Sequence, residues 1–163
     1  VLLSGPEPQR TILEDKIVRD ISHYNHTAVV VRGLPGSNTL IPSTGMIRFY
    51  NHLPAAELAK EIARADLIIS RSGYSTVMDI LCLQKKSILI PTPGQTEQEY
   101  LAGYLQQQGY AVSMKQQGFS VAAALQRAQQ HPYTFIPAAE NTARSKVIDD
   151  FIGSLPAKPV IQQ

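Results

Sequence analysis

The sequence predicts an α/β fold built on a parallel sheet, and three observations support this prediction. Short β-rich runs alternate with longer segments of helical periodicity, as expected for repeated strand–helix units. Two of the runs, Leu67–Ser70 and Ser87–Ile90, are almost continuously apolar, which is typical of strands buried on both faces. The 163 residues are 44% apolar and 17% charged, so the chain can bury the core of an ordinary domain.

The expected elements follow this alternation, with about six strands and helices on both faces of a Rossmann-like sheet. The strands are expected at Val1–Ser4, Thr27–Arg32, Met46–Tyr50, Leu67–Ser70, Ser87–Ile90 and Ala111–Met114. The helices are expected at Arg10–Ile21, Pro54–Arg64, Ser75–Leu83, Glu97–Gln108, Ser120–Gln130 and Ala138–Leu155. Residues 1–155 would then form one domain, and residues 156–163, which include two prolines, a C-terminal tail.

Composition excludes several classes of protein. The formal net charge of +2 is too small to indicate nucleic acid as the main partner. The single cysteine, Cys82, excludes an internal disulfide and a cysteine-based zinc site, and the four histidines form no metal-binding pattern. The chain has no initiator Met and starts directly in a strand-like run, so we expect it to be part of a longer protein.

A parallel sheet also predicts where a ligand binds. Ligands of such folds lie beyond the carboxyl ends of the strands, on the loops that enter helix N-termini. Three loops of this kind are expected, at Ser4–Gln9, Arg71–Ser75 and Pro91–Thr96.

The loop after Ser70 carries the strongest signal. Gly73 permits a tight turn or a close backbone approach, and the N–H groups of the following helix could hold a phosphate. At about 100° per residue, Ser75, Thr76 and Asp79 share one side of the first turn, where Asp79 could accept hydrogen bonds from sugar hydroxyls. Thr76 and Asp79 also fit a capping box, which would give them a purely structural role.

The other two loops are less specific. Thr96 and Glu99 fit a capping box, whereas the amide of Gln98 offers a donor and an acceptor suited to sugar hydroxyls. The Ser4–Gln9 loop has one glycine, Gly5, between strand and helix, which is a weak phosphate-loop pattern. Arg10 could reach a phosphate, although a solvated arginine at a helix start is the more ordinary interpretation.

Two motifs in this order resemble the C-terminal domain of family 28 glycosyltransferases, which include the N-acetylglucosaminyltransferases of peptidoglycan synthesis. The first comprises Arg71-Ser72-Gly73 with Thr76 and Asp79, after Ala65-Asp66 and an apolar strand. The second is Gln98-Glu99-Tyr100, after a loop that starts at Pro91. The resemblance implies the C-terminal half of a two-domain GT-B enzyme, with residues 1–155 holding a nucleotide-sugar donor.

The resemblance also implies roles for residues. Backbone groups around Tyr74, Ser75 and Thr76 would face the diphosphate, Asp79 the ribose, Gln98 and Glu99 the donor sugar, and Tyr50 the base. The full set of candidate donor-binding residues is Gly5, Tyr50, Arg71, Ser72, Gly73, Tyr74, Ser75, Thr76, Asp79, Gln98 and Glu99. No catalytic residue, metal or cofactor is assigned in this chain.

The implied function is donor binding in an inverting, metal-independent transferase that moves a hexosyl or N-acetylhexosaminyl group from a UDP-sugar-like donor. The implied partners are the nucleotide sugar and an N-terminal acceptor-binding domain, in a cytoplasmic enzyme of the cell envelope that could lie at the inner membrane face. Two alternatives remain open: a nucleotide-sugar hydrolase or epimerase of the same fold, and a non-catalytic nucleotide-binding domain. Pro6, which lacks an N–H, and Asp79, shorter than the usual Glu, depart from the family pattern.

Overall fold

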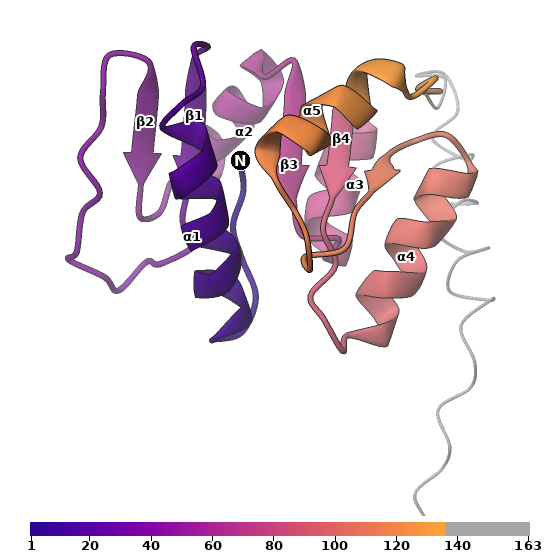
Figure 1. Cartoon of the computed structure of the whole chain (residues 1–163), viewed down its shortest axis with the longest axis horizontal. Coiled ribbons are helices and arrows are strands. Elements are labelled where there is room, and N and C mark those ends of the chain that lie inside the picture. The colour runs from indigo at the N-terminus through magenta and orange to yellow at the C-terminus, as the bar shows by residue number, and fades with distance from the viewer. Residues whose placement is uncertain (136–163) are drawn as a thin grey trace, which may run out of the picture.

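The computed structural model describes residues 1–135. The expected helix Ala138–Leu155 and the tail at residues 156–163 therefore lie outside the described residues. The helices are α1 (Gln9–Ile21), α2 (Ala55–Arg64), α3 (Tyr74–Cys82), α4 (Thr96–Gln107) and α5 (Val121–Gln130). The strands are β1 (Ala28–Val31), β2 (Ile47–Tyr50), β3 (Leu67–Ser70), β4 (Lys86–Leu89) and β5 (Val112–Ser113). Every one of these elements lies where the alternating pattern predicts it (Figure 1).

All the strand pairs are parallel, which confirms the α/β prediction. β1 pairs with β2, with Ala28 opposite Ile47, and β3 pairs with β4, with Leu67 opposite Lys86. β5 adds to β4, with Ile88 opposite Val112. The expected single sheet of about six strands is wrong, because the described residues form a two-stranded and a three-stranded sheet.

The difference lies at Val1–Ser4, which was expected to be a full strand. Only Leu2 makes bridges there, to Val31 on one side and to Ser70 on the other. The Leu2 N–H donates to the Ile69 carbonyl at 2.8 Å, and the Leu3 N–H donates to the Val31 carbonyl at 2.8 Å. The segment thus lies between the two sheets but pairs with each of them over too few residues to count as a strand.

Helices cover both faces, and each face has its own apolar core. Alternating strand residues point to opposite sides, so Ile69 and Ile88 join one core while Ile68 and Leu89 join the other. The first core is closed by α1 and α5, through residues that include Ile17. The second core is closed by the helices α2, α3 and α4. This arrangement explains why the central strands are apolar at nearly every position (Figure 1).

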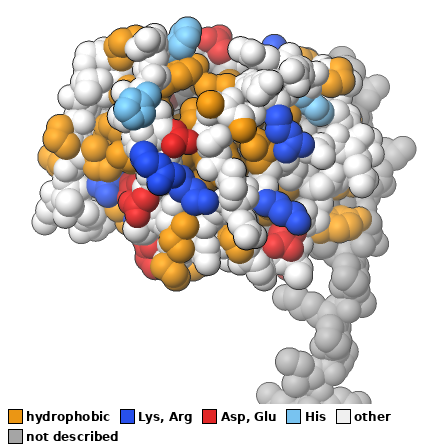
Figure 2. All heavy atoms as spheres, in the orientation of Figure 1, with side chains coloured by type: hydrophobic (Ala, Val, Ile, Leu, Met, Phe, Trp, Pro, Cys, Tyr) orange, Lys and Arg blue, Asp and Glu red, His pale blue; other side chains and the backbone are white. Residues whose placement is uncertain are grey.

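The distribution of charged side chains on the surface agrees with the small net charge of the chain. Figure 2 shows acidic and basic side chains interspersed on the face that carries α1 and α5. Within residues 1–135, no helix is long and apolar enough to cross a membrane.

Candidate functional site

Three strand–helix loops meet at one edge of the molecule, the lower edge in Figure 1. They join Leu3 to α1, β3 to α3, and β4 to α4. One close approach and one hydrogen bond show that these loops are neighbours. A Cβ placed on Gly5 would lie 3.3 Å from the Thr92 hydroxyl, and the Ser72 hydroxyl donates to the Gln98 carbonyl at 2.8 Å. The parallel topology thus brings together the segments that the sequence predicts as a site.

The N-terminus of α3 is open at this edge. Gly73 is its N-cap, no side chain caps it, and the first helical bond runs from the Val77 N–H to the Gly73 carbonyl at 3.0 Å. The N–H groups of the first turn, at Tyr74, Ser75 and Thr76, therefore lack intrahelical acceptors. These groups and the helix dipole favour an anion at this position.

The orientation of α3 follows its pattern. Val77 and Ile80 are buried against the sheet, whereas Ser75 and Asp79 are exposed and Thr76 is half-buried. The capping-box interpretation of Thr76 and Asp79 is wrong. The helix already begins at Tyr74, so Thr76 lies inside its first turn and is not the N-cap. The carboxylate of Asp79 therefore has no structural role as a cap.

Gly73 has an ordinary backbone conformation and open space beside its Cα. Its φ of −69° and ψ of 140° are ordinary extended values that other residues adopt, so no tight turn requires glycine here. A Cβ built on Gly73 would meet no atom within 4 Å. The missing side chain thus leaves open space directly before the free N–H groups of α3.

The Pro91–Thr96 loop is held by the first turn of α4. The Gln98 side-chain oxygen accepts from the Thr92 N–H at 3.0 Å, and the Glu99 carboxylate accepts from the Gly94 N–H at 3.2 Å. The expected capping box from Thr96 is wrong, because the N-cap is Gln95 and no side chain caps the helix. Glu99 is exposed and Gln98 half-buried, so both remain at the surface of the edge while bracing the loop.

Arg71 lies beneath the loops. It is 1% exposed, and its guanidinium donates to the carbonyls of Gln9 at 2.7 Å and Ile90 at 3.2 Å, and to the Gln116 side-chain oxygen at 2.6 Å. A fourth bond reaches the Pro91 carbonyl at 3.3 Å. Burial lowers the pKa of Arg71 to about 10, which still leaves it protonated at neutral pH. The side chain therefore ties all three loops together from below.

Gln116 also helps to hold the loops together, and the sequence analysis did not identify it. It is 5% exposed, and its amide donates to the Gln9 side-chain oxygen at 2.7 Å while its own oxygen accepts from Arg71. It lies 45 residues from Arg71 in the chain, and nothing in its local sequence marks it. Ser72, 1% exposed, is likewise turned inward.

The first loop differs from the other two. The Glu7 carboxylate accepts from the Thr11 N–H at 3.2 Å and from the Arg10 guanidinium at 2.6 Å, so it occupies the N-terminus of α1. Hydrogen bonds from Thr11 and Arg10 hold the pKa of Glu7 below its ordinary value. Gly5 has φ +103°, a conformation that favours glycine. The conformation of this loop is therefore held by the carboxylate of Glu7, a residue of the loop itself.

A buried ionic cluster lies behind this loop. Glu14 accepts from Arg10 at 3.1 Å and from Arg32 through two bonds, and all three side chains are less than 10% exposed. Burial alone would raise the pKa of Glu14, but hydrogen bonds from Arg32 and Arg10 outweigh it and hold that pKa below the ordinary value. The expectation of a solvated Arg10 is wrong, because the helix carries it into this cluster.

The cluster extends toward Tyr50. Arg32 donates to the Asn51 side-chain oxygen at 2.7 Å and, through its backbone N–H, to the Tyr50 carbonyl at 2.8 Å. Arg48 lies over the Tyr50 ring, with its guanidinium carbon 6.0 Å from the ring centroid. Tyr50 is half-buried at the end of β2, at the same edge of the molecule as the loops. β2 belongs to a different sheet from β3, the strand that precedes α3.

The chain matches the family model described as the glycosyltransferase family 28 C-terminal domain over residues 46–151. The chain belongs to this family. The match covers both of the loops that form the open part of the site, after β3 and after β4. It confirms the resemblance to this family that the two motifs indicate.

Two curated relatives are similar in sequence to this chain. The UDP-N-acetylglucosamine--N-acetylmuramyl-(pentapeptide) pyrophosphoryl-undecaprenol N-acetylglucosamine transferase of Desulforudis audaxviator is 37% identical over 91 residues, which are 55% of this chain and 23% of that protein. The protein of the same name from Lachnoclostridium phytofermentans is 32% identical over 105 residues, 60% of this chain and 29% of that protein. The chain thus spans about a quarter of the length of these curated relatives.

Two solved structures share the fold. Spinosyn forosaminyltransferase SpnP superposes with a TM-score of 0.57 over 95% of this chain and 39% of its own, at 13% identity. The glycosyltransferase SnogD from Streptomyces nogalater gives a TM-score of 0.56 over 92% of this chain and 43% of its own, at 14% identity. At such low identity the likeness concerns the fold alone, and it agrees with the GT-B half expected from the sequence.

Proposed function

We propose that this chain is the donor-binding domain of an inverting, metal-independent glycosyltransferase that uses a UDP-sugar-like donor. The observation that carries the proposal is the uncapped N-terminus of α3 beside the open space at Gly73, within the part of the chain that matches family 28. A diphosphate there would accept hydrogen bonds from the first-turn N–H groups of the helix.

The remaining roles follow from what stays exposed around that point. Asp79 would accept hydrogen bonds from the ribose hydroxyls, and Gln98 and Glu99 would face the donor sugar. Tyr50 would lie against the base. Arg71 and Ser72 are assigned to donor binding through the loops they hold, because both side chains are 1% exposed. Gly5 would contribute by leaving room next to Thr92.

The leaving diphosphate would be stabilised without a metal. Negative charge develops on the diphosphate as the glycosidic bond breaks, and preorganised N–H donors at a helix N-terminus stabilise that charge. The sugar acceptor and the general base would come from an N-terminal domain, and a direct displacement by the acceptor would invert the anomeric centre. The donor domain itself is proposed to comprise residues 1–155, followed by the tail.

The relatives' names suggest the rest of the setting. They are N-acetylglucosamine transferases that use UDP-N-acetylglucosamine and a pyrophosphoryl-undecaprenol substrate. We therefore propose N-acetylglucosamine as the transferred sugar, a lipid-linked acceptor, and a cytoplasmic enzyme that meets the inner membrane face through its full-length form.

A non-catalytic nucleotide-binding domain is the second candidate, and one observation favours it. Glu7 already occupies the N-terminus of α1, so the first loop offers no free site for a phosphate. In that case the chain would bind nucleotide at α3 while the full protein would transfer no sugar.

The test is isothermal titration of the chain with UDP, GDP and TDP in separate experiments. Saturable binding with preference for UDP is expected, and no binding of any nucleotide at millimolar concentration would refute both candidates. Gly73→Ala should fold as the parent does and weaken UDP binding at least about tenfold, because a methyl group would fill the space before α3. Gly36→Ala is the matched control, since its Cβ would also meet no atom within 4 Å. Equal loss of affinity in the two variants would contradict the proposed position of the diphosphate.

A further inference from the structure

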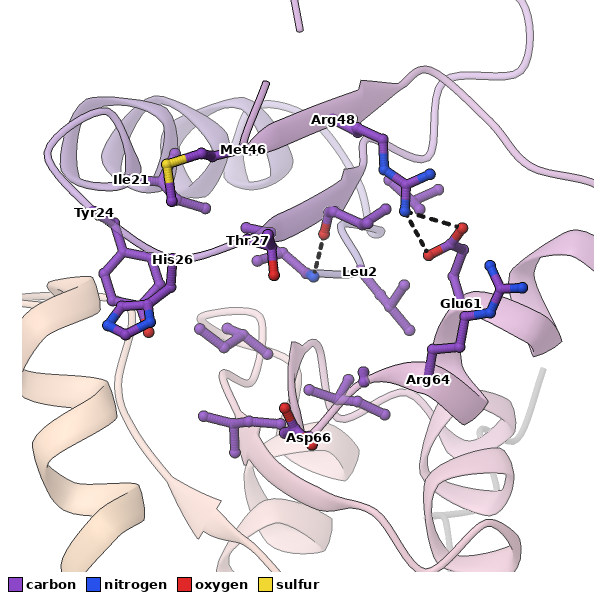
Figure 3. Close-up of a pocket in the computed structure, with 18 of the residues that line it drawn as sticks. Leu2, Ile21, Tyr24, His26, Thr27, Met46, Arg48, Glu61, Arg64 and Asp66 are labelled. Carbon is purple, nitrogen blue, oxygen red and sulfur yellow. Dashed lines mark hydrogen bonds and ion pairs between the residues drawn. The ribbon is translucent and has the colours of Figure 1, made fainter. Parts of the chain in front are cut away.

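The two edges of the molecule differ in how far their polar side chains are paired within the protein. A cavity of about 580 Å³ lies at the edge opposite the donor loops. Figure 3 shows Arg48 and Glu61 at this cavity directed toward each other, and they form an ion pair at 3.2 Å. At the donor edge, by contrast, the side-chain amide of Gln95 keeps hydrogen-bond donors that no group of the described chain accepts.

Gln95 is the last residue of a tight turn at residues 92–95. The Gln95 N–H donates to the Thr92 carbonyl at 3.0 Å, and Gly94 has φ +80°. Proline at the second position of a turn, here Pro93, and glycine with positive φ at the third are typical of a type II turn. The side chain of Gln95 therefore starts from a well-defined backbone position, at the N-cap of α4.

One backbone group decides the orientation of two side-chain amides in this loop. The Thr92 N–H donates to Gln98 Oε1 at 3.0 Å, so the amide nitrogen of Gln98 points the other way. That nitrogen donates to Gln95 Oε1 at 2.5 Å. Because the oxygen of Gln95 is used in this bond, its amide nitrogen with two N–H donors is the group that remains. Gln95 is half-buried, and this nitrogen has no acceptor within residues 1–135.

Glu99 supplies an acceptor on the same loop. One oxygen of its carboxylate accepts from the Gly94 N–H at 3.2 Å, and the side chain is exposed. The second oxygen accepts no hydrogen bond from the part of the chain that the structure describes. An amide donor and a carboxylate acceptor together suit a sugar, because each hydroxyl group can both accept and donate.

The N-termini of α3 and α4 lie side by side but differ in charge. The Ser72 hydroxyl, just before α3, donates to the Gln98 carbonyl in the first turn of α4 at 2.8 Å. The first turn of α3 contains no acidic residue, whereas that of α4 contains Glu97 and Glu99. Acidic side chains compensate the positive end of a helix dipole, so α4 favours a neutral hydroxylated group where α3 favours an anion. This difference matches a neutral sugar attached to a diphosphate.

We propose that Gln95 determines specificity for the transferred sugar, because its side-chain N–H groups donate to a hydroxyl or acyl oxygen of that sugar. Gln98 is then a positioning residue, which fixes the direction of the Gln95 amide. The inference rests on the proposed donor-binding function and deepens it by separating contact from positioning within one loop. A sugar without an oxygen at this point would leave the donors of Gln95 unpaired and would bind less well.

The test compares two ligands, UDP and UDP-N-acetylglucosamine, by isothermal titration of the chain and its variants. The ratio of the Kd for UDP to the Kd for UDP-N-acetylglucosamine reports the contribution of the sugar, because effects on the diphosphate cancel in it. Gln95→Glu keeps an oxygen for the Gln98 amide but removes both N–H donors. The ratio should therefore fall about 3–10-fold, as expected for the loss of a hydrogen bond. Gln107→Glu, exposed at the opposite end of α4, is the matched control and should leave the ratio unchanged.

Gln98→Glu tests the positioning role. A carboxylate at this position still accepts from the Thr92 N–H, but it has no proton to donate to Gln95. The Gln95 amide should then turn its N–H groups toward that carboxylate and away from the sugar, and the ratio should fall as it does in Gln95→Glu. When Gln95→Met is already present, Gln98→Glu should lower the ratio no further, because Gln98 acts through Gln95. A further loss in the double variant would show that Gln98 contacts the sugar itself and would overturn its positioning role.

Hydrogen exchange separates this effect from a loss of loop structure. The Thr92 amide should be as well protected in Gln95→Glu and Gln98→Glu as in the parent, because both variants retain its acceptor. If the parent binds UDP but Gln95→Glu leaves the ratio unchanged, the inference is overturned while the proposed donor function stands. If the parent binds neither ligand, the donor function is refuted and the inference with it.

Discussion

Two helix N-termini at the same edge of the molecule show how similar features acquire different uses. At α1, the Glu7 carboxylate accepts from the Thr11 N–H at 3.2 Å, and an internal acid thus fills the anion position. At α3, no side chain caps the helix, and the space in front of Gly73 is open. Both helices follow β-type segments that end in a glycine-containing loop, so the local pattern alone does not separate them.

The comparison shows that the presence of a helix N-terminus does not by itself indicate an anion site. What matters for ligand binding is that no side chain of the protein already occupies that N-terminus. The charges near α1 are mutually compensated by Glu7, Arg10, Glu14 and Arg32, and they hold structure together. The polar groups around α3, chiefly Ser75 and Asp79, are exposed and make no capping bond. The first region is expected to govern stability and the second to govern ligand affinity, and the following changes separate the two.

The largest effect is expected from Glu14→Gln, which would leave Arg10 and Arg32 buried with a neutral partner. The free energy of unfolding should fall by about 3–5 kcal/mol, because removing one member of a buried ionic cluster leaves uncompensated charge. Chemical denaturation measures this, with exposed Asp15→Asn as the control, expected within about 0.5 kcal/mol of the parent.

The same cluster predicts in which direction the stability of the protein changes as the pH is lowered. The pKa of Glu14 is held below its ordinary value, so its contribution to stability is lost as the pH falls through that lowered pKa. Glu14→Gln should therefore remove part of the acid sensitivity of the Tm. An unchanged profile would mean that Glu14 is not ionised in the folded protein.

Arg71→Met should have the next largest effect, at about 2–3 kcal/mol of unfolding free energy, because the change removes four hydrogen bonds from a buried cation. UDP affinity should fall as well, since the loops would lose their common anchor. Arg19→Met is the control, with a side chain that is 71% exposed. Normal UDP affinity in Arg71→Met would show that the three loops keep their arrangement without the tie.

Asp79→Ala should leave stability nearly unchanged and weaken UDP binding by about 1–3 kcal/mol, because a hydrogen-bonded carboxylate would be lost from the ribose. Isothermal titration measures this, with Asp66→Ala, at the opposite edge, as the control. Glu7→Gln should not reduce UDP affinity. A greater loss in Glu7→Gln than in Asp79→Ala would reverse the roles assigned to the two helices.

The smallest effect is expected from Thr92→Val. The Thr92 hydroxyl is buried and has no hydrogen-bond partner among the described residues, so an isosteric methyl group should change stability by less than about 1 kcal/mol in either direction. UDP affinity should remain that of the parent. A clear loss of affinity would show that loop movement exposes this hydroxyl to the donor.

Much of the fold and of the candidate site could be predicted from local pattern. The apolar runs and helical periods located all the described elements, and the parallel topology then placed Ser75, Asp79 and Gln98 at one edge. These predictions succeed because strand and helix periodicity depend on neighbouring residues, and because parallel strands end at the same side of a sheet.

The tertiary structure decided those features of the protein that depend on contacts between segments distant in the sequence. Arg71 could be recognised in the motif, but its burial beneath the loops depends on Gln9, Ile90 and Gln116, the last of them 45 residues away. The ionic cluster of Arg10, Glu14 and Arg32 depends in the same way on how separate elements pack. The sequence by itself determined the order of elements and the position of the candidate site. Only the packed structure decided which charged groups are satisfied within the protein and which remain free for a ligand, because burial and hydrogen-bond partners are set in three dimensions.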